Sequence, residues 1–370
     1  MNIPFYSFES IHEPIKDELK DAFSKILDNG YFILGESLRT FEYSYAAFNN
    51  VKYCIGVSNG LDALFLSLKA LNIGPGDEVI VPANTYIATF LAVSYVGAKP
   101  VPVEPDVASY NLNPKLIEQA ITSRTKAVIP VHLYGQACEM EPIVELAKKY
   151  GLKIIEDNAQ SQGAYYSGRM TGSFGDCNAT SFYPGKNLGA LGDAGAITTN
   201  NQDLFEKISL LRNYGSSRKY FHELLGYNMR LDELQAAILK IKLPLLSSWI
   251  KQKESIALKY NERLCGVGDL VLPYVIPLST HVYHQYVIRT KFRDALKEYL
   301  EKLGVLTLVH YPIPPHLQDA YLDLKYKVGS FPITEDLAKT NLSLPIWPGM
   351  TDEMVDYIST SIKLFFNTKS

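Results

Sequence analysis

The chain has 370 residues, of which 47% are hydrophobic and 20% charged, and its formal net charge is −3 at pH 7. This composition excludes an intrinsically disordered or collagen-like protein. A chain of this length buries enough surface to need no disulfide or structural metal. The weak net charge, without blocks of like charge, gives no reason to expect nucleic acid or an anionic membrane as a partner. We therefore expect a small-molecule ligand.

The four cysteines are scattered and form no C-x-x-C pair. This spacing fits neither a disulfide framework nor a zinc cluster, so we expect buried or half-buried thiols in a reducing compartment. The N-terminal segment carries charges where a secretory signal needs a continuous apolar run. Both observations predict a cytoplasmic protein. The cysteines are Cys54, Cys138, Cys177 and Cys265.

The chain begins with a helical pattern and continues with a β/α alternation. Apolar residues at helical spacing predict an amphipathic helix over 9–28, which Asn29-Gly30 ends. From about residue 59 to 200, short apolar runs alternate with helical patterns. Strands without polar interruptions, separated by helices, predict a largely parallel sheet covered on both faces. The runs are 78–83, 99–105, 126–135, 152–157, 179–184 and 195–199.

Residues 79–98 carry no charge and are long enough to span a bilayer. They contain a proline, an asparagine and several hydroxyl groups, and they divide into a β-rich run and a helix-like run. We therefore interpret this segment as buried core of the α/β domain and expect no association with a membrane.

The C-terminal part predicts a second, smaller unit. A helical pattern over 230–265 is interrupted at Pro244. Strand-like and helical patterns then alternate around a proline-rich turn at 311–315, which indicates an α+β domain. We expect a large α/β domain over 1–240, including the N-terminal helix, and a smaller α+β domain over 241–370.

Several common catalytic motifs are missing from the sequence. There is no G-x-G-x-x-G after a strand and no G-x-x-x-x-G-K-[ST], so the sequence lacks the phosphate-binding motifs of dinucleotide-binding and P-loop proteins. The histidine pairs at 281 and 284 and at 310 and 316 have no accompanying H-E-x-x-H or Cys/His cluster, so we expect no metal site.

Three features instead suggest a phosphorylated pyridine cofactor. Ligands of a parallel sheet bind beyond the carboxyl ends of its strands. Asp157 follows such a strand, where an ionised carboxylate needs a cation, such as a protonated pyridine nitrogen, opposite it. Lys186 follows another strand in a Pro-Gly turn and could form a Schiff base, although it could equally be a surface lysine. Residues 58–64 lead into a helix whose free N–H groups suit a phosphate, or simply form an N-cap. Together they match the needs of pyridoxal 5′-phosphate (PLP).

Ordered sequence blocks run through nearly the whole chain, at 30–42, 58–64, 74–89, 131–136, 154–164, 172–176, 181–199, 226–237, 284–289, 310–316 and 342–350. With these blocks the sequence resembles the fold-type I PLP-dependent sugar aminotransferases of the DegT/DnrJ/StrS type. The resemblance implies an aspartate-aminotransferase-like large domain with a mostly parallel seven-stranded sheet, and a smaller α+β C-terminal domain. It also implies PLP as the cofactor and a homodimer whose active sites are shared between subunits.

The resemblance further implies roles for individual residues. Lys186 is expected to form the Schiff base and to move the reacting proton, and Asp157 to pair with the pyridinium nitrogen. The other expected cofactor contacts are Tyr86 on the ring face, Gln160 beside the ring hydroxyl, Ser181 with the backbone of Gly60 and Leu61 at the phosphate, and Asn228 from the neighbouring subunit. The expected substrate contacts are Arg230, His310, Tyr311 and His316.

One departure from the family pattern concerns the phosphate. Many relatives have Ser-Gly-Thr where this chain has Asn59-Gly60-Leu61, so a hydroxyl that could contact the phosphate is missing. A close neighbour in the family is a dehydratase with histidine at the lysine position, and Lys186 argues against that activity.

The block at 60–64 is more similar to members that aminate C3 of a dTDP-3-keto-6-deoxyhexose than to those acting at C4. We therefore expect amino transfer from L-glutamate to such a sugar, giving a dTDP-3-amino-3,6-dideoxyhexose. The alternatives are an aminotransferase for a C4-keto sugar nucleotide or a cyclitol, and a PLP-binding regulatory protein.

Overall fold

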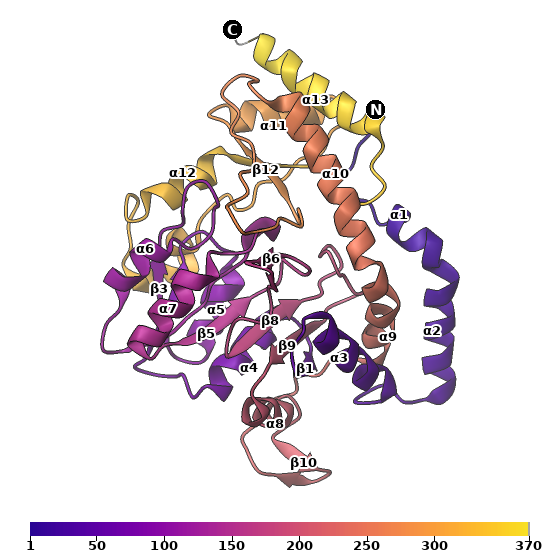
Figure 1. Cartoon of the computed structure of the whole chain (residues 1–370), viewed down its shortest axis with the longest axis vertical. Helices are drawn as coiled ribbons and strands as arrows, with labels where there is room; N and C mark the ends of the chain where they lie inside the picture. Colours follow the sequence, from indigo (N-terminus) through magenta and orange to yellow (C-terminus); the bar gives the residue numbers. More distant parts are fainter. Residues whose placement is uncertain (369–370) are drawn as a thin grey trace.

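A computed structural model describes residues 1–368 of the chain. Its centre is a seven-stranded sheet in the order β1-β9-β8-β5-β4-β2-β3 (Figure 1). β9 runs antiparallel to both of its neighbours, and the other adjacent pairs are parallel, which confirms the predicted mostly parallel sheet. The strands are β1 (Tyr53–Val57), β2 (Glu78–Pro82), β3 (Lys99–Val103), β4 (Thr125–Val128), β5 (Lys153–Asp157), β8 (Cys177–Ser181) and β9 (Gly195–Thr199).

The fourth strand is shorter than its apolar run. The run at 126–135 predicts a long strand, but β4 ends at Val128. Pro130 has no N–H to donate to a ladder, and the chain then turns through a 3₁₀ segment at Leu133–Gly135. Beyond β4, a single parallel bridge between Val131 and Asp157 continues the pairing with β5. The turn therefore lies beside the carboxyl end of β5.

Helices cover both faces of the sheet, which explains why every residue of a central strand such as β2 is buried. In β2, Val79 and Val81 pack with the helices of one face, whereas Ile80 packs with those of the other. The first face carries α4 (Gly60–Ala70), α5 (Ile87–Tyr95) and α8 (Gln202–Leu211); the second carries α6 (Pro114–Ile117) with the 3₁₀ turn Glu118–Ala120, and α7 (Met140–Tyr150). Residues 79–98 thus form β2 and α5, as predicted.

The predicted N-terminal helix is interrupted. It consists of α1 (Glu9–His12), a 3₁₀ turn at Glu13–Ile15 that contains Pro14, and α2 (Lys16–Asn29). Gly30 ends α2 with φ +65°, a left-handed conformation that glycine adopts without strain. Ile15 and Leu19 pack against α9.

The remaining helices of the large unit lie beside the sheet. α3 (Glu36–Phe48) packs against β1 and α9 (Glu233–Lys242). A 3₁₀ turn at Leu243–Leu245, which contains Pro244, joins α9 to α10 (Leu246–Leu264). Two-stranded ribbons complete this part: β6 (Tyr165–Tyr166) with β7 (Arg169–Met170), and β10 (Ser216–Arg218) with β11 (Phe221–His222).

The C-terminal part has a hydrophobic core of its own. Ile256 and Tyr260 of α10 belong to this second core, whereas Leu246 and Ile250 belong to a core of the large unit. Ile3 also enters the second core and pairs with Gly304. The division at residue 240 stays a prediction, since α10 contributes to both cores. The further elements are β12 (Tyr286–Arg289), α11 (Arg293–Lys302), the 3₁₀ turns Pro315–Leu317 and Asp319–Leu324, α12 (Pro332–Thr340), β13 (Asn341–Leu344) and α13 (Asp352–Asn367).

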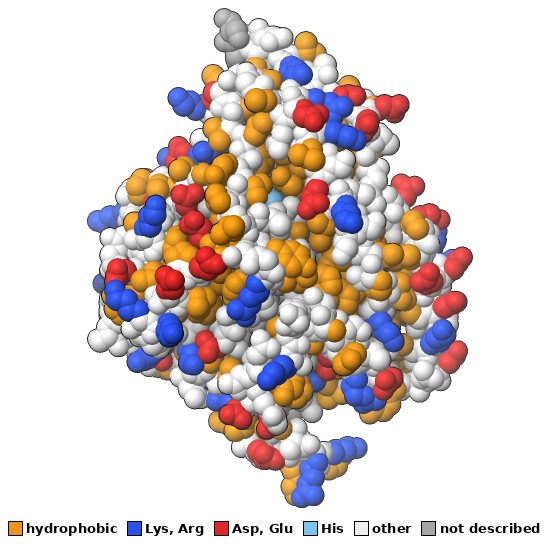
Figure 2. All heavy atoms as spheres, in the orientation of Figure 1, with side chains coloured by type: hydrophobic (Ala, Val, Ile, Leu, Met, Phe, Trp, Pro, Cys, Tyr) orange, Lys and Arg blue, Asp and Glu red, His pale blue; other side chains and the backbone are white. Residues whose placement is uncertain are grey.

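The surface charges are mixed, as the weak net charge predicts, and three of the four cysteines are buried. Figure 2 shows positive and negative side chains intermixed over the visible face. Cys54, Cys138 and Cys177 are buried, but Cys265 is exposed because it directly follows the end of α10, so the prediction was wrong for this thiol. Among the helices of residues 1–368, none is long and apolar enough to cross a membrane.

Candidate active site

The predicted catalytic residues follow strands at the carboxyl edge of the sheet. Asp157 is the last residue of β5, and Lys186 lies in the loop that follows the neighbouring β8. Tyr86 precedes α5, in the loop that follows β2. Since β2, β4, β5 and β8 are adjacent and parallel, their carboxyl ends bring these side chains to one edge.

Asp157 is a buried carboxylate with 7% of its surface exposed. Its Oδ2 accepts a hydrogen bond from Thr89 Oγ1 at 3.1 Å, and its Oδ1 accepts one from the Ala159 N–H at 3.2 Å. Burial raises the pKa of Asp157, and the hydrogen bonds and the charge of Lys186 oppose that rise only in part. The site therefore contains a carboxylate that a further cation would stabilise.

Lys186 is half-buried in a tight turn, in which its N–H donates to the Tyr183 carbonyl at 2.8 Å. Burial lowers the pKa of its amine to about 8, and the Asp157 carboxylate acts in the opposite direction. A larger fraction of this amine is neutral near pH 7 than of an ordinary lysine, and only the neutral amine is a nucleophile.

The predicted phosphate site joins the start of α4 to the end of β8. The N–H groups of Gly60 and Leu61 are in the first turn of α4 and have no acceptor within residues 1–368. A Cβ at position 60 would lie 2.6 Å from Ser181 Cβ, so the two segments meet here. The Leu61 side chain packs towards the hydrophobic core, which leaves its N–H as the group available to an anion.

A chain of contacts surrounds Gln160. Its Oε1 accepts from the Tyr134 N–H at 2.7 Å, and its Nε2 donates to Tyr311 Oη at 3.2 Å. The Tyr311 ring lies 5.3 Å from the ring of Tyr86, measured between centroids. Burial raises the pKa of Tyr311, so its hydroxyl stays protonated and can also donate.

His310 lies beside this group, whereas His316 is engaged elsewhere. The Tyr134 hydroxyl donates to the His310 carbonyl, and His310 Nδ1 is 2.8 Å from Ser343 Oγ. Burial, assisted by the charge of Lys186, lowers the pKa of His310 to about 4, so the ring is neutral. His316 is 2% exposed, and its Nε2 lies 3.2 Å from Glu335 Oε1. This contact gives the buried imidazole a hydrogen-bonding partner within the fold. Its role towards the substrate stays a prediction.

Asn228 and Arg230 lie on a different part of the chain. Asn228 is exposed and forms a backbone bridge with Asn213, and Arg230 Nη1 donates to Asn213 Oδ1 at 3.1 Å. Both residues thus contact the loop that follows α8. A contact of Asn228 with the cofactor of a neighbouring subunit stays a prediction.

The geometry fits PLP at three points. The paired segments at Gly60 and Ser181 leave unpaired N–H donors for a phosphate, and a side chain at position 60 would obstruct them. The buried Asp157 suits a protonated ring nitrogen, and the Lys186 amine is available to a carbonyl carbon. Tyr86 and Gln160 lie at the same edge of the sheet and can border the ring.

Comparison with known proteins gives the same answer. The model of the DegT/DnrJ/EryC1/StrS aminotransferase family matches residues 13–363. The chain belongs to this aminotransferase family. This confirms the predicted family, and the protein is a transaminase with PLP as its cofactor.

The similarity of this aminotransferase to individual relatives extends over nearly its full length. The dTDP-3-amino-3,6-dideoxy-alpha-D-galactopyranose transaminase of Aneurinibacillus thermoaerophilus is 50% identical over 98% of this chain and 99% of its own. The erythromycin biosynthesis sensory transduction protein EryC1 of Saccharopolyspora erythraea is 46% identical over 98% and 99%. The crystal structure of S. venezuelae DesV in complex with a ketimine intermediate has a TM-score of 0.97, with 45% identity over 98% of both chains.

The structure of the aminotransferase adds residues that the sequence analysis missed. Thr89 donates to Asp157, and its place one helical turn after Tyr86 is a signal that the spacing could have revealed. Tyr134 links Gln160 to His310, but its left-handed backbone, with φ +60°, has no signature in the sequence. Asn341 Nδ2 donates to the His310 carbonyl at 2.8 Å.

Proposed function

We propose that this aminotransferase transfers the amino group of L-glutamate to C3 of a dTDP-3-keto-6-deoxyhexose, giving a dTDP-3-amino-3,6-dideoxyhexose. The observation that carries the proposal is the 50% identity, over 98% of the chain, to a transaminase named for a dTDP-3-amino-3,6-dideoxygalactose. The site supports it because a lysine and a buried carboxylate lie together at the mouth of the sheet.

We assign the binding of PLP to residues from four strand ends. Ser181 and the N–H groups of Gly60 and Leu61 hold the phosphate, Asp157 faces the ring nitrogen, Tyr86 covers the ring and Gln160 lies beside the ring hydroxyl. When bound, PLP supplies a carbonyl group that takes up the amine and a ring that withdraws electrons from the reacting carbon. Asp157 keeps the ring nitrogen protonated, and Thr89 holds Asp157 in place.

Lys186 is the group that carries the reacting proton. Its pKa of about 8 lets the amine both accept and release a proton near neutral pH, as a general acid–base catalyst requires. The neutral His310 imidazole and the Tyr311 hydroxyl are hydrogen-bonding groups at the same edge, and we assign them to the sugar nucleotide.

We further propose a cytoplasmic homodimer with shared active sites, in which Asn228 reaches the partner's phosphate. Support comes from the hairpin β10–β11 and its flanks, which present apolar side chains to the exterior: Tyr220 is 81% exposed and Leu225 95%. Exposed residues of this size are typical of protein interfaces. The division into domains at 1–240 and 241–370 belongs to the same proposal.

The first test is an absorbance spectrum of the purified protein with PLP, before and after excess L-glutamate. We expect a band near roughly 410–430 nm that converts to one near roughly 330 nm, and recovery of the first band on addition of the keto sugar. Lys186→Ala should lose both responses. A protein that binds no PLP, or a Lys186→Ala variant that turns over at the native rate, contradicts the proposal.

The position of the new amine is a separate measurement. The NMR spectrum of the product distinguishes an amine at C3 from one at C4, and the same assay with a cyclitol ketone tests the third substrate class. An amine at C4 would show that the protein is an aminotransferase but would contradict the proposed C3-keto substrate.

A regulatory protein is the second candidate, because the relative from S. erythraea is named a sensory transduction protein. Such a protein would bind PLP without multiple turnovers of glutamate and keto sugar. The set of Lys186, Asp157, Gln160 and Ser181 favours turnover. A protein that forms the first band but consumes no keto sugar would favour regulation.

A further inference from the structure

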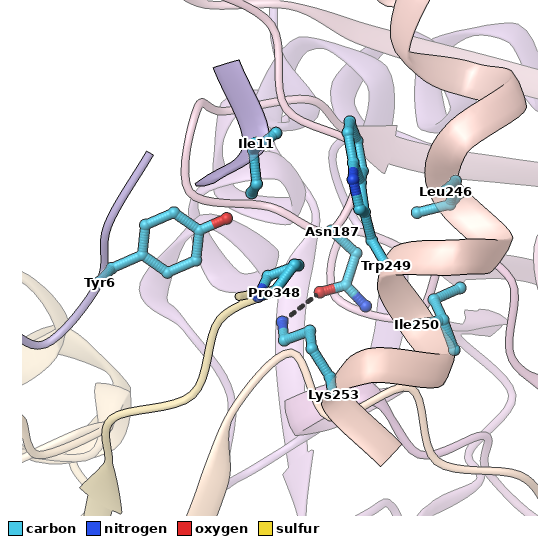
Figure 3. Close-up of a pocket in the computed structure, with 8 residues that line it drawn as sticks. All are labelled: Tyr6, Ile11, Asn187, Leu246, Trp249, Ile250, Lys253 and Pro348. Atoms are coloured by element: carbon cyan, nitrogen blue, oxygen red, sulfur yellow. Dashed lines mark hydrogen bonds between the residues drawn. The ribbon is translucent and has the colours of Figure 1, made fainter. Parts of the chain in front are cut away.

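A second lysine is buried next to the catalytic loop. Lys253, on α10, is 2% exposed, and its Nζ donates to Asn187 Oδ1 at 2.8 Å (Figure 3). Asn187 directly follows Lys186 in the chain. Figure 3 shows the Lys253 amine directed to the Asn187 amide from below, with Trp249 of the same helix beside it.

The environment of Lys253 is unusual for a lysine. Within residues 1–368 no carboxylate pairs with it, and its acceptor is the side-chain oxygen of Asn187. The small cavity at this point is otherwise bordered by Tyr6, Ile11, Leu246, Trp249, Ile250 and Pro348. Burying an ammonium group without a counter-ion costs free energy, and burial accordingly lowers its pKa to about 7. A lysine buried in this way lowers the stability of the fold, so its presence points to a role other than folding.

Asn187 holds the loop from two sides. While its Oδ1 accepts from Lys253, its Nδ2 donates to the Val282 carbonyl at 3.1 Å, and the amide is 7% exposed. The Val282 N–H in turn donates to the Gly135 carbonyl at 2.9 Å. Through this series of contacts, α10 fixes the backbone that carries Lys186 and the turn that carries Tyr134.

Two buried histidines lie near enough to Lys253 to be affected by its charge, and one of them, His284, is also affected by the charge of Lys186. His284, 9% exposed, is subject to the charges of both lysines, and burial together with these charges lowers its pKa well below the usual value. His281 is buried near Lys253 and has its pKa lowered to about 3, mainly by burial. Both rings are therefore neutral and leave the amine without a negative partner.

We propose that Lys253 is a positioning residue of the transamination: by holding Asn187 it fixes the direction from which the Lys186 side chain enters the site. This inference deepens the proposed function and rests on it. A displacement of about 1 Å at a reacting group can cost on the order of 100-fold in rate, so a hydrogen bond one residue away from Lys186 can govern catalysis.

The test compares Lys253→Met, Asn187→Ala and the double variant, each as the PLP-loaded protein. We expect each single variant to slow the glutamate-driven change of the absorbance band, in a single turnover, by on the order of 10- to 100-fold. The Kd for glutamate should change by less than about threefold, because Lys253 does not contact the donor. The visible circular dichroism of the bound cofactor should change as well, since it reports how Lys186 holds it. Lys253→Arg should recover part of the rate.

The double variant decides whether Lys253 acts through Asn187. If it does, the double variant is about as slow as the slower single variant. If instead the rate losses of the two single variants multiply in the double variant, the proposal is overturned. Should Lys253→Met not fold, Lys253→Arg alone and combined with Asn187→Ala gives the same decision: if the lysine acts through Asn187, the arginine changes the rate of the wild type but not that of Asn187→Ala.

Two controls separate positioning from loss of stability. Lys251→Met removes an exposed lysine of the same helix, and Ile256→Ala removes a packed side chain of α10 that belongs to the second core. We expect Ile256→Ala to lower the Tm while leaving the rate and the dichroism near those of the wild type at a temperature where it is folded. Equal losses in Ile256→Ala, or an unchanged Lys253→Met, overturn this proposal alone. A wild-type protein without the glutamate response overturns the proposed function, and this inference with it.

Discussion

Gly60 and Ser181 approach each other so closely that a Cβ atom at position 60 would lie 2.6 Å from the Cβ of Ser181. The first residue of α4 is thereby held against the last residue of β8. The free N–H groups of a helix N-terminus and a serine hydroxyl then face the same small space, which is the arrangement an anion needs. The absence of a side chain at position 60 is therefore a condition of the phosphate site.

We predict that Gly60→Ala weakens PLP binding by at least about tenfold, because the added methyl group must push the start of α4 away from β8 and misalign the N–H donors. The measurement is a titration of the apo-protein with PLP, followed by the absorbance of the bound cofactor. Gly74→Ala is the matched control, since a Cβ there would meet only the Val96 carbonyl at an ordinary 3.6 Å. Equal affinity of Gly60→Ala and the control would contradict the prediction.

The sheet could be predicted from the sequence because strands that are buried on both faces need apolar residues on both sides. The runs that became β2, β3, β5, β8 and β9 each place apolar residues at neighbouring positions, as strands covered on two sides do, although β5 and β8 also contain polar residues. β4 is shorter than its run because Pro130 and the turn at Tyr134 remove the chain from the ladder, and apolar character does not reveal where pairing stops. β1, with the sequence YCIGV, was not predicted although it is mostly buried; its Gly56, a residue that is disfavoured in strands, weakens the strand signal.

The site was predictable where a residue follows a strand, and unpredictable where a contact depends on two distant segments. Asp157 and Lys186 belong to the first kind. The hydrogen bond from Tyr134 to His310 spans 176 positions, and the contact of Lys253 with Asn187 spans 66. Such contacts are set by how the two cores pack around α10, for which local periodicity carries no information.

The buried Glu156, next to Asp157, leads to a prediction about stability. It is fully buried, accepts from the Gly172 N–H at 2.8 Å and the Gly175 N–H at 3.1 Å, and pairs with His132 Nε2 at 2.8 Å. Glu156→Gln replaces one acceptor oxygen by an amide donor and leaves backbone N–H groups unsatisfied, so we expect a loss of about 2 to 4 kcal/mol in the free energy of unfolding.

Chemical denaturation of the apo-protein measures this loss, provided that the slope with denaturant stays unchanged. Glu118→Gln makes the same chemical change at an exposed carboxylate bonded to Lys149 and Tyr150, and should have little effect. If the two variants are equally stable, the contacts of Glu156 do not support the fold as inferred.

The lowered pKa of Lys186 predicts how cofactor capture depends on pH. In the apo-protein, the rate at which PLP combines with the lysine should rise with pH, reach half of its plateau near pH 8, where half of the amine is neutral, and level off above that pH. Asp157→Asn should move this midpoint to lower pH, because the carboxylate acts to raise the pKa of Lys186. Stopped-flow absorbance at a series of pH values gives the midpoint. Nα-acetyl-lysine, with its ordinary pKa of about 10.4, corrects for the titration of PLP itself. A protein midpoint equal to that of the free amine would refute the shift.

The raised pKa of Asp157 predicts how the stability of the apo-protein depends on pH. A carboxyl group whose pKa is higher in the folded than in the unfolded chain stabilises the fold in its protonated form, and this contribution is lost as pH rises through the folded value. The Tm of Asp157→Asn, which stays neutral, should therefore rise relative to the wild type as pH increases above the ordinary pKa of an aspartate, about 3.9. Scanning calorimetry of both apo-proteins measures the difference, with Asp323→Asn as an exposed control that follows the wild type. Added PLP should raise the Tm of the wild type more than that of Asp157→Asn, because only the carboxylate gains a cationic partner. A Tm difference that stays constant with pH would show that the buried charge carries no cost.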